Sequence, residues 1–446
     1  MDFSPHTEGD VRAMLETIGA DGIESLFEPI PDSVRLNDPL RVPPALSEPE
    51  LVAALGALAS ANTAQDLVCF AGGGVYDHYI PAAVKSLASR SEFATSYTPY
   101  QAELSQGILQ ALFEFQSLVC EIYGMDVANA SLYDGANSMV EAVNLAVRAT
   151  GRSRVLVAST LHPHYADVLR TYTIGLGLDI AMAPATGHGI VDWTEADFAG
   201  AAAVVVAYPN VFGRLEDAAA ACDAAHAHDA LAVVAADPTA MGILRSPGEM
   251  GADVAVGEGQ ALGNAMFYGG PCVGLFATTE RLVRQVPGRI SGETLDADGR
   301  RAFVLTLQAR EQHIRRAKAT SNVCTNQTLL AVAAGVHLAW LGPAGLARLG
   351  ETCASRAAFA AARLADIPGC SLKFPGPHFK EFVLETPVDG RELARRLARR
   401  GWLAGPGLGD WFPELDRCLL VAATERRTED EVIAFAEAVE KELTGP

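Results

Sequence analysis

Lysine is scarce in this 446-residue sequence, which contains only Lys85, Lys318, Lys373, Lys380 and Lys441. No lysine lies between residues 86 and 317. Arginine is present there, but its guanidinium stays protonated and cannot form an imine with an aldehyde. The absence therefore excludes chemistry that needs an amine nucleophile from the central part of the chain.

Positive charge is also in short supply. The sequence has 34 Lys and Arg against 54 Asp and Glu, which gives a net charge of −20. This charge repels nucleic-acid phosphates and anionic lipid headgroups, so we expect neither nucleic acid nor a membrane as a partner. The N-terminus lacks the basic-then-apolar layout of a secretory signal. The longest apolar run, at 199–209, is about half of the ~20 residues that span a membrane. We expect a cytoplasmic protein.

The cysteines form no CxxC pair, which argues against a disulfide framework or a zinc site and favours reduced core thiols. No group of His, Cys, Asp and Glu has the spacing of metal ligands, so the sequence predicts no metal site. The eight cysteines are Cys69, Cys120, Cys222, Cys272, Cys324, Cys353, Cys370 and Cys418.

The composition, 49% apolar and 20% charged, is that of a globular protein with a large core and two or three domains. Residues 1–60 are rich in proline and acidic residues and predict an arm that needs another surface to lie on. Residues 61–325 predict a large α/β domain. Residues 326–446 predict a smaller α+β domain, with strands at 379–385 and 417–424 and a long helix at about 323–341 before them.

Strands and helices alternate in the middle of the chain. Apolar segments at 153–160, 178–185, 201–209 and 231–237 predict strands, and the segments 163–175 and 215–230 predict helices between them. This pattern indicates a mainly parallel sheet covered on both faces. Ligands of such sheets bind beyond the carboxyl ends of the strands. The residues to inspect are those that follow each strand: His162, Pro209, Asn210, Asp237 and Glu258.

Three features of this part of the chain have both a functional and a structural interpretation. Residues 133–149 place a glycine and small polar residues before an amphipathic helix, which suits a phosphate cradle or an ordinary N-capped helix. His162 could stack on an aromatic ligand ring or cap the next helix. Asp237 needs a cationic partner at the end of a buried strand, either a protonated pyridine nitrogen or an Arg or helix N-terminus.

A glycine-bearing cradle, a histidine after a strand and an aspartate after a later strand follow one another in the order seen in fold type I pyridoxal-phosphate enzymes, the aspartate-aminotransferase-like class. By resemblance to that class, a lysine holding the cofactor aldehyde is expected about fifteen to twenty-five residues after the aspartate. That position falls near Gln260 and Ala261, where this sequence has no lysine.

Longer matches make the resemblance specific. The chain resembles the glycine dehydrogenase (decarboxylating) family, the P-protein of the glycine cleavage system, and within it the subunit 1 branch, the N-terminal-half subunit of the two-subunit bacterial form. The matching segments cover nearly the whole chain: 70–84, 95–107, 124–136, 208–217, 251–263, 267–278, 288–329 and 377–385. The segments "GNAMFYGGPC" and "AYPN" depart from the family's usual sequence.

The resemblance implies a function shared between two chains. Subunit 2 would supply the lysine that anchors pyridoxal 5'-phosphate, with nothing covalently bound to this chain, and two copies of each would form a heterotetramer. The complex would decarboxylate glycine and transfer the aminomethyl group to the lipoyl arm of H-protein. Two alternatives stay open: a non-catalytic assembly or regulatory subunit, and an independent pyridoxal-fold enzyme such as a desulfurase or aminotransferase.

Candidate site residues lie in three loops. Tyr97, Tyr100 and Gln101 are expected to reach the partner's site as catalytic residues, although a proline turn packed with aromatics would look the same. A glycine-rich turn, Gly269, Gly270 and Pro271, is expected beside the partner's cofactor, and segment 320–327 is a third candidate. His162 and Asp237 would then belong to a relict cofactor pocket and be structural in this chain.

Overall fold

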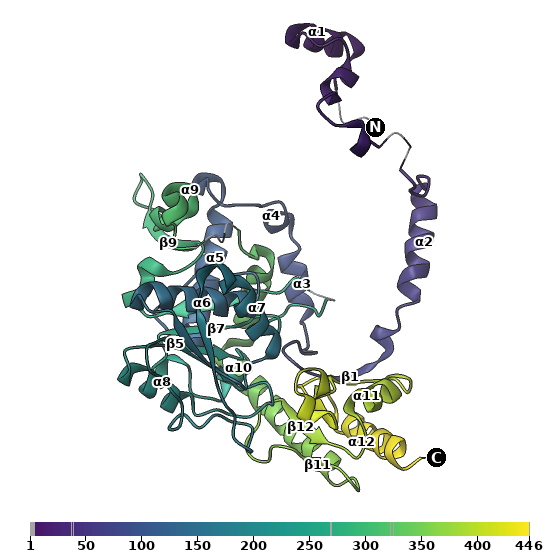
Figure 1. The fold of residues 1–446 in the computed structure, drawn as a ribbon, viewed down its shortest axis with the longest axis vertical. Coiled ribbons are helices and arrows are strands. Elements are labelled where there is room, and N and C mark those ends of the chain that lie inside the picture. The colour runs from purple at the N-terminus through teal and green to yellow at the C-terminus, as the bar shows by residue number, and fades with distance from the viewer. Residues whose placement is uncertain are drawn as a thin grey trace. The chain divides into compact units, whose positions relative to one another are not determined.

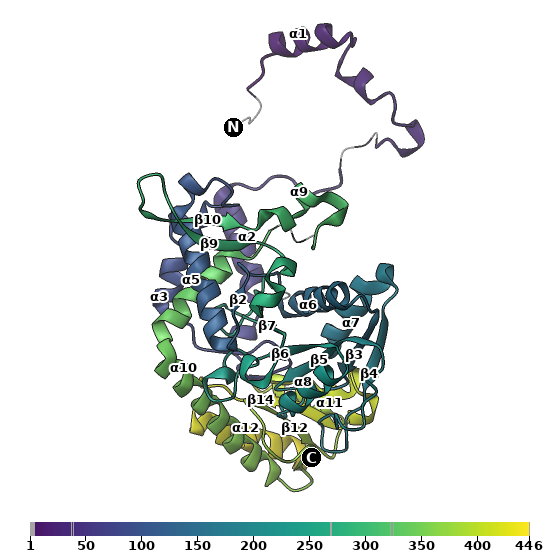
Figure 2. The ribbon, with the colours of Figure 1, turned by 90° about the vertical axis from the view of Figure 1, so that its left-hand side faces the viewer.

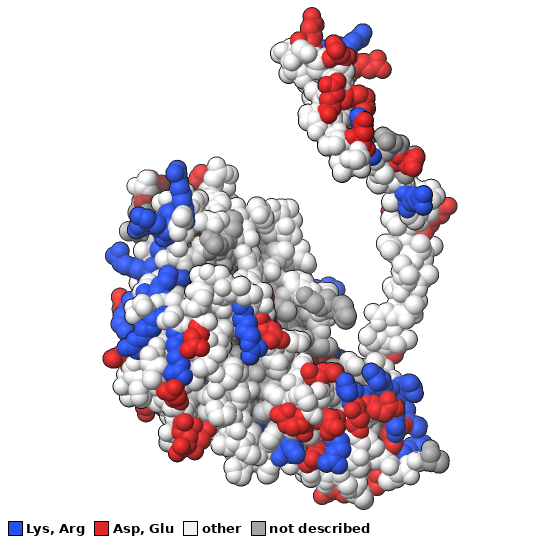
Figure 3. Space-filling view, viewed as in Figure 1, with Lys and Arg blue, Asp and Glu red and all other residues white. Residues whose placement is uncertain are grey.

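The computed structural model describes residues 5–36, 38, 40–267, 270–321, 323 and 325–445. They form two units, Met1–Thr63 and Ala64–Pro446. The first contains helices α1 (Glu8–Ile18) and α2 (Glu48–Ser60), each begun by a capping box. None of its described residues is buried. Beyond its first turn, α2 carries no charge (Figure 3), so this helix presents an apolar surface. The described residues of the unit form no core of their own.

The second unit is built around a seven-stranded sheet (Figures 1 and 2) with the strand order β2-β8-β7-β6-β5-β3-β4. Five neighbouring strands, β7, β6, β5, β3 and β4, run parallel, whereas β8 pairs antiparallel with both β7 and β2. Their bounds are β2 Val127–Ala128, β3 Arg154–Ala158, β4 Asp179–Ala183, β5 Ala201–Tyr208, β6 Leu231–Ala236, β7 Val254–Glu258 and β8 Gly274–Thr278. The mainly parallel sheet expected from the alternating apolar segments is confirmed.

Helices cover both faces of this sheet, which is why its central strands are apolar along their whole length. One core packs α5 (Gln106–Tyr123), α8 (Ala218–Ala227) and part of α10 against the sheet. A second core packs α6 (Gly135–Thr150) and α7 (Pro163–Thr173) against the other face. The helix α5 ends at Gly124, whose φ of 64° is left-handed, as is common for a glycine at the end of a helix.

A short hairpin and several small helices lie in the same unit as this sheet. Strands β9 (Ile290–Leu295) and β10 (Arg301–Thr306) pair antiparallel beside α5. Both ends of the Gln106 amide bond the backbone of Phe303 on β10, which ties the start of α5 to this hairpin. The short helices are α3 (Ala82–Ala88), α4 (Ser91–Ala94) and α9 (Gln312–Arg315).

The long helix α10 (Thr328–Ala365) extends well past the expected 323–341. Gly342 has φ 60° and ψ 179°, so the chain bends there, and Pro343 begins a second helical stretch. Glycine followed by proline predicts a helix end in sequence, but here the helix resumes. By length and composition α10 could cross a membrane. Its two halves nevertheless bury side chains in two different cores of the protein.

The C-terminal part contains an antiparallel sheet of β11 (Ser371–Leu372), β12 (Glu381–Glu385) and β14 (Cys418–Ala422), with helices α11 (Gly390–Ala398) and α12 (Glu429–Thr444). A separate parallel pair joins β13 (Trp402–Gly405) to β1 (Val68–Ala71). Phe70 of β1 stacks on Phe435 of α12, with ring centroids 4.1 Å apart. An early segment of the chain is therefore part of the C-terminal core.

Candidate functional site

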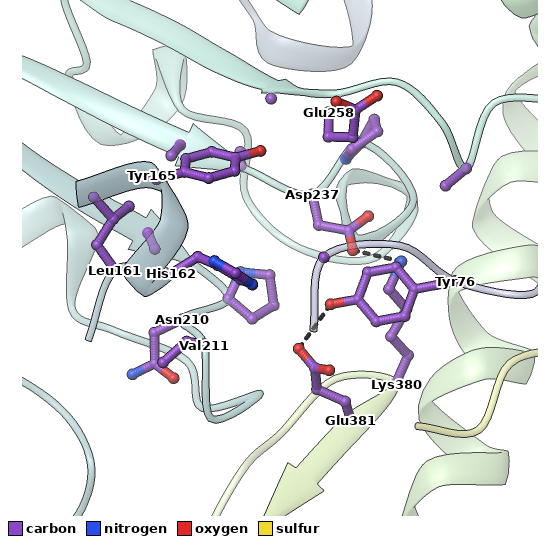
Figure 4. A pocket seen from close by; sticks show the side chains of 18 of the residues that line it. Tyr76, Leu161, His162, Tyr165, Asn210, Val211, Asp237, Glu258, Lys380 and Glu381 are labelled. Carbon is purple, nitrogen blue, oxygen red and sulfur yellow. Dashed lines mark hydrogen bonds and ion pairs between the residues drawn. The ribbon is translucent and has the colours of Figure 1, made fainter. Parts of the chain in front are cut away.

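A small cavity of about 100 Å³ lies at the carboxyl ends of the parallel strands (Figure 4). The five residues singled out for following a strand all line it: His162, Pro209, Asn210, Asp237 and Glu258. Parallel strands end at the same edge of the sheet, which is why the positions of the strand ends in the sequence were enough to predict these five residues together. Gln260 and Ala261, just after Glu258, also line it, and polar lining residues from segments far away along the chain are Tyr76, Lys380 and Glu381.

Asp237 pairs with a lysine, which is neither the pyridine nitrogen nor the Arg or helix N-terminus that the sequence suggested. The Lys380 Nζ lies 2.6 Å from Asp237 Oδ2. The Thr239 hydroxyl and backbone N–H donate to Asp237 Oδ1 at 2.6 and 2.9 Å. Burial raises the pKa of the Asp237 carboxyl, but Lys380 and Thr239 outweigh it and hold the pKa below its ordinary value. The carboxylate is therefore ionised and neutralised by a cation from the chain itself.

Lys380 is almost fully enclosed, with 2% of its surface exposed. Its Nζ lies 3.7 Å from the centre of the Tyr76 ring, a cation–π contact, and 3.2 Å from His78 Nε2. It also donates to the Thr239 hydroxyl at 3.3 Å. The backbone φ of Lys380 is +33°, a strained value for a residue with a side chain. The surrounding contacts thus hold this ammonium in one place despite that strain.

Behind Lys380, three side chains from distant segments come together: His78, Cys353 and Glu425. Their ligand atoms all lie within 4.8 Å of one another, a group that sequence spacing did not predict. Glu425 Oε2 lies 2.7 Å from His78 Nδ1 and accepts from Cys353 Sγ at 3.4 Å. Glu425 Oε1 accepts from the Tyr79 N–H. Because these atoms are already bonded to one another and the Lys380 ammonium lies beside His78, the group serves as a hydrogen-bond network.

The N-terminus of α6, the predicted phosphate cradle, is filled by carboxylates. The N-cap Asp134 accepts from the Asn137 N–H, as in an ordinary capped helix. Glu258 Oε2 accepts from the Gly135 N–H at 2.9 Å. Glu258 Oε1 accepts from the N–H groups of Gln260 and Val273 at 2.9 and 3.1 Å. Three backbone donors that could hold an anion therefore hold this side chain.

Glu258 is enclosed at the same time as it receives those bonds. Burial raises its pKa to about 7, although the three N–H groups and the helix dipole act in the opposite direction. The backbone of α6 approaches closely here, since a Cβ at Gly135 would collide with the Tyr165 hydroxyl and the backbone of β7. The glycine in this motif is required by packing between α6 and β7.

His162 serves as the cap of α7, the structural interpretation that the sequence left open. Its Nδ1 accepts from the His164 N–H at 3.1 Å, so Nε2 carries the proton and donates to the Gly73 carbonyl at 2.8 Å. Burial lowers the pKa of the imidazole to about 4, which keeps it neutral. Its ring meets Trp411 edge-on, with centroids 4.8 Å apart. Both ring nitrogens are thus used within the chain.

At the position expected for a cofactor lysine, Gln260 and Ala261 line the cavity. The Gln260 Oε1 accepts from the Tyr76 N–H at 3.1 Å, and its Nε2 donates to the Asn264 carbonyl at 2.8 Å. The Tyr76 hydroxyl donates to Glu381 Oε1 at 2.7 Å (Figure 4). The amide at residue 260 therefore fixes the loop that carries Tyr76 over the cavity.

The loop of Tyr97, Tyr100 and Gln101 lines a different cavity, an open groove of about 700 Å³. Tyr97 is 80% exposed and Tyr100 46% exposed. The buried Arg289 donates to the Tyr100 hydroxyl at 2.8 Å and lies 4.8 Å from its ring centre. The structure does not bring this loop together with His162 and Asp237, which line the small cavity.

The described residues among the remaining candidates line neither cavity. Gly270, with φ 111°, and Pro271 are described, whereas Gly269 lies outside the described residues. In the segment 320–327, the Asn326 side chain donates to the Ala130 carbonyl at 2.9 Å, which ties this segment to the chain before α6.

Sequence reasoning missed Tyr76, Lys380 and Glu381. A charged pair, Lys380-Glu381, at the start of an otherwise apolar strand was the available signal, because charges enter a buried strand only when they are paired. Their partners lie in segments far away along the chain, which no local pattern reports.

Comparison with known proteins gives a consistent result over the whole chain. The family model of the glycine cleavage system P-protein matches residues 1–439. A probable glycine dehydrogenase (decarboxylating) subunit 1 from Prosthecochloris aestuarii is 49% identical, over 98% of this chain and 99% of that protein. A crystal structure of glycine decarboxylase (P-protein) in inhibitor-bound form is similar, with a TM-score of 0.90 and 44% identity over 99% of this chain and all of that one. A cysteine desulfurase from Thermococcus onnurineus, at 15% identity, covers 86% of this chain and 96% of its own with a TM-score of 0.66, and shares the fold alone.

Proposed function

The chain belongs to the glycine cleavage system P-protein family, and we propose that it acts as subunit 1 of glycine dehydrogenase (decarboxylating). In this function it combines with subunit 2 to decarboxylate glycine with pyridoxal 5'-phosphate and to transfer the aminomethyl group to the lipoyl arm of H-protein. The complex contains two copies of each subunit and works in the cytoplasm.

One observation carries the proposal. The chain covers 99% of a relative named subunit 1, yet Gln260 and Ala261 stand where fold type I enzymes place their cofactor lysine. Fold type I sites lie beside a dimer interface, so one chain can contribute side chains to the site of its neighbour. The lysine is then supplied by subunit 2, and this chain completes that site from outside.

The exposed surface supports a large protein partner. Helix α2 presents apolar side chains that no described residue of its own unit buries. Tyr97 and Leu104, exposed by 80% and 78%, line the groove beside α5. Exposed apolar patches of this kind are typical of surfaces that a partner covers.

The groove also supports a role for this chain in the reaction. Arg289 donates to the Tyr100 oxygen, so the hydroxyl proton of Tyr100 stays available to donate to a third group. Because Arg289 is buried, the exposed phenol is held in one orientation. We assign Tyr100, with Tyr97 and Gln101 on the same loop, to the site of subunit 2 as contributed hydrogen-bond donors. Gly269, Gly270 and Pro271 are assigned to the border of that site.

The test is the exchange of labelled bicarbonate into the carboxyl group of glycine. The full-length chain alone should give no exchange, and the addition of subunit 2 should restore it. Exchange by this chain alone at the rate of the complex would refute the proposal and favour an independent pyridoxal-fold enzyme. Variants of the Tyr97–Gln101 loop that leave the complex intact distinguish a role in the reaction from a role in assembly alone. They should slow exchange only if the loop reaches the site of subunit 2.

A further inference from the structure

We infer that the cavity of this chain is closed to pyridoxal phosphate, even without a covalent bond, because Glu258 and Lys380 occupy the places of the cofactor's two charged ends. The inference depends on the fold and on this cavity alone, and it holds whether or not the glycine activity is as proposed. It differs from the missing lysine, since a pocket without that lysine could still hold the cofactor through its phosphate and ring nitrogen.

The phosphate end is occupied by Glu258. Backbone N–H groups at a helix N-terminus suit a phosphate, and the first N–H of α6, from Gly135, already bonds this carboxylate. Its other oxygen accepts from the N–H groups of Gln260 and Val273, between β7 and β8. Asp134 places a second carboxylate at the same helix end. A phosphate entering here would meet carboxylates in place of free donors.

The ring end is occupied by Lys380. In pyridoxal enzymes the aspartate after the strand serves the protonated ring nitrogen, and Asp237 is that aspartate by position. Its Oδ2 is instead 2.6 Å from the Lys380 ammonium, a cation enclosed by Tyr76, His78 and Thr239. A second cation could approach Asp237 only after this ammonium had left.

The volume of the cavity is also too small for the cofactor. The cavity measures about 100 Å³, whereas pockets for cofactor-sized ligands span roughly 300–1,000 Å³. The side chains of Tyr76 and Glu381, bonded to each other at 2.7 Å, also line it (Figure 4). Side chains of this protein therefore neutralise the charges of the cavity and fill most of its volume.

The experiment titrates the full-length chain with pyridoxamine 5'-phosphate in a calorimeter. This probe has the phosphate and pyridine ring of the cofactor, but its amine cannot form imines with lysine side chains. The opening variant is Glu258→Ser with Lys380→Met, which clears both charges. The matched control, Glu249→Ser with Lys373→Met, makes the same two changes at an exposed carboxylate and at a half-exposed lysine paired with Glu385.

The wild-type chain and the control should show no saturable binding up to about 1 mM. The opening variant should bind one probe per chain. Each charge removed should tighten binding at least ~10-fold, about 100-fold together. Saturable binding of one probe to the wild-type chain would overturn the inference. So would a folded opening variant, checked by circular dichroism, that binds no better than the control.

A second variant keeps the inference testable if the first does not fold. Glu258→Ser alone leaves the Lys380–Asp237 pair in place and opens only the end of α6. By phosphorus NMR it should bind inorganic phosphate at least ~10-fold more tightly than the wild-type chain. Equal affinities in the two proteins would show that Glu258 does not close an anion site.

Discussion

Replacing Lys380 by methionine tests the ion pair in the cavity. Methionine keeps the length of the side chain and removes its charge, which leaves Asp237 buried without a cation. Breaking a buried pair in this way costs about 3–5 kcal/mol. The folded unit of about 380 residues unfolds with an entropy of roughly 0.8 kcal/mol/K, at ~2.1 cal/mol/K per residue. The expected fall in Tm is therefore about 4–6 °C.

Differential scanning calorimetry of the full-length chain measures this shift. The double variant Asp237→Asn with Lys380→Met removes both charges and should regain most of the lost stability. Lys373→Met, which breaks a half-exposed pair with Glu385, should change the free energy of unfolding by less than about 1 kcal/mol. If Lys380→Met leaves Tm unchanged, the ammonium does not neutralise Asp237 and the account of the cavity is wrong.

Four further outcomes are expected. Borohydride reduction of the chain with pyridoxal phosphate should leave no stoichiometric pyridoxyl-lysine in residues 61–325 on peptide mapping; a stoichiometric adduct on Lys85 or Lys318 would contradict the prediction. In the complex with subunit 2, Tyr100→Phe should slow bicarbonate exchange about 5- to 150-fold, from the loss of ~1–3 kcal/mol, while sizing shows an intact complex; an unchanged rate would make the loop structural. The pKa of Glu258, about 7 when folded, lies above the 4.5 of an unfolded glutamate, so the folded state retains a proton that the unfolded state releases. The stabilisation that this proton gives is complete below about pH 4.5, and about 3 kcal/mol of it is lost as the pH rises through 7. In urea unfolding at several pH values, Glu258→Gln should not show this loss. Parallel curves of unfolding free energy against pH for the two proteins would refute the prediction. Ala261→Lys should not turn over glycine without subunit 2, because Glu258 and Lys380 still fill the cavity; turnover by that variant would show that only the lysine had been lost.

The parts of the site that follow the sheet were predictable from sequence. Each short apolar strand ends at the same edge, so His162, Asp237 and Glu258 could be placed together without coordinates. The choice between a phosphate cradle and a capped helix could not be made, since it depends on the Glu258 side chain of β7 reaching the first N–H group of α6, that of Gly135.

Lys380 shows the limit of that reasoning. A count of lysines by position correctly found none near Ala261, but it could not show that Lys380, the residue before β12, pairs with Asp237 from the C-terminal part of the chain. The predicted end of the long helix was wrong for a related reason. Gly342 and Pro343 break helices locally, yet cores on both sides of the bend hold the two stretches of α10 in place.

The pairing of β1 with β13 has a consequence for synthesis on the ribosome. Residues Val68–Ala71 leave the exit tunnel about 330 residues before the strand that they must join. Until then the Phe70 ring lacks its partner on α12, which emerges later still. Such distant contacts form slowly and expose apolar segments meanwhile. The first strand therefore stays unpaired for most of translation. The C-terminal part of the chain folds last, around a segment that was synthesised near the beginning.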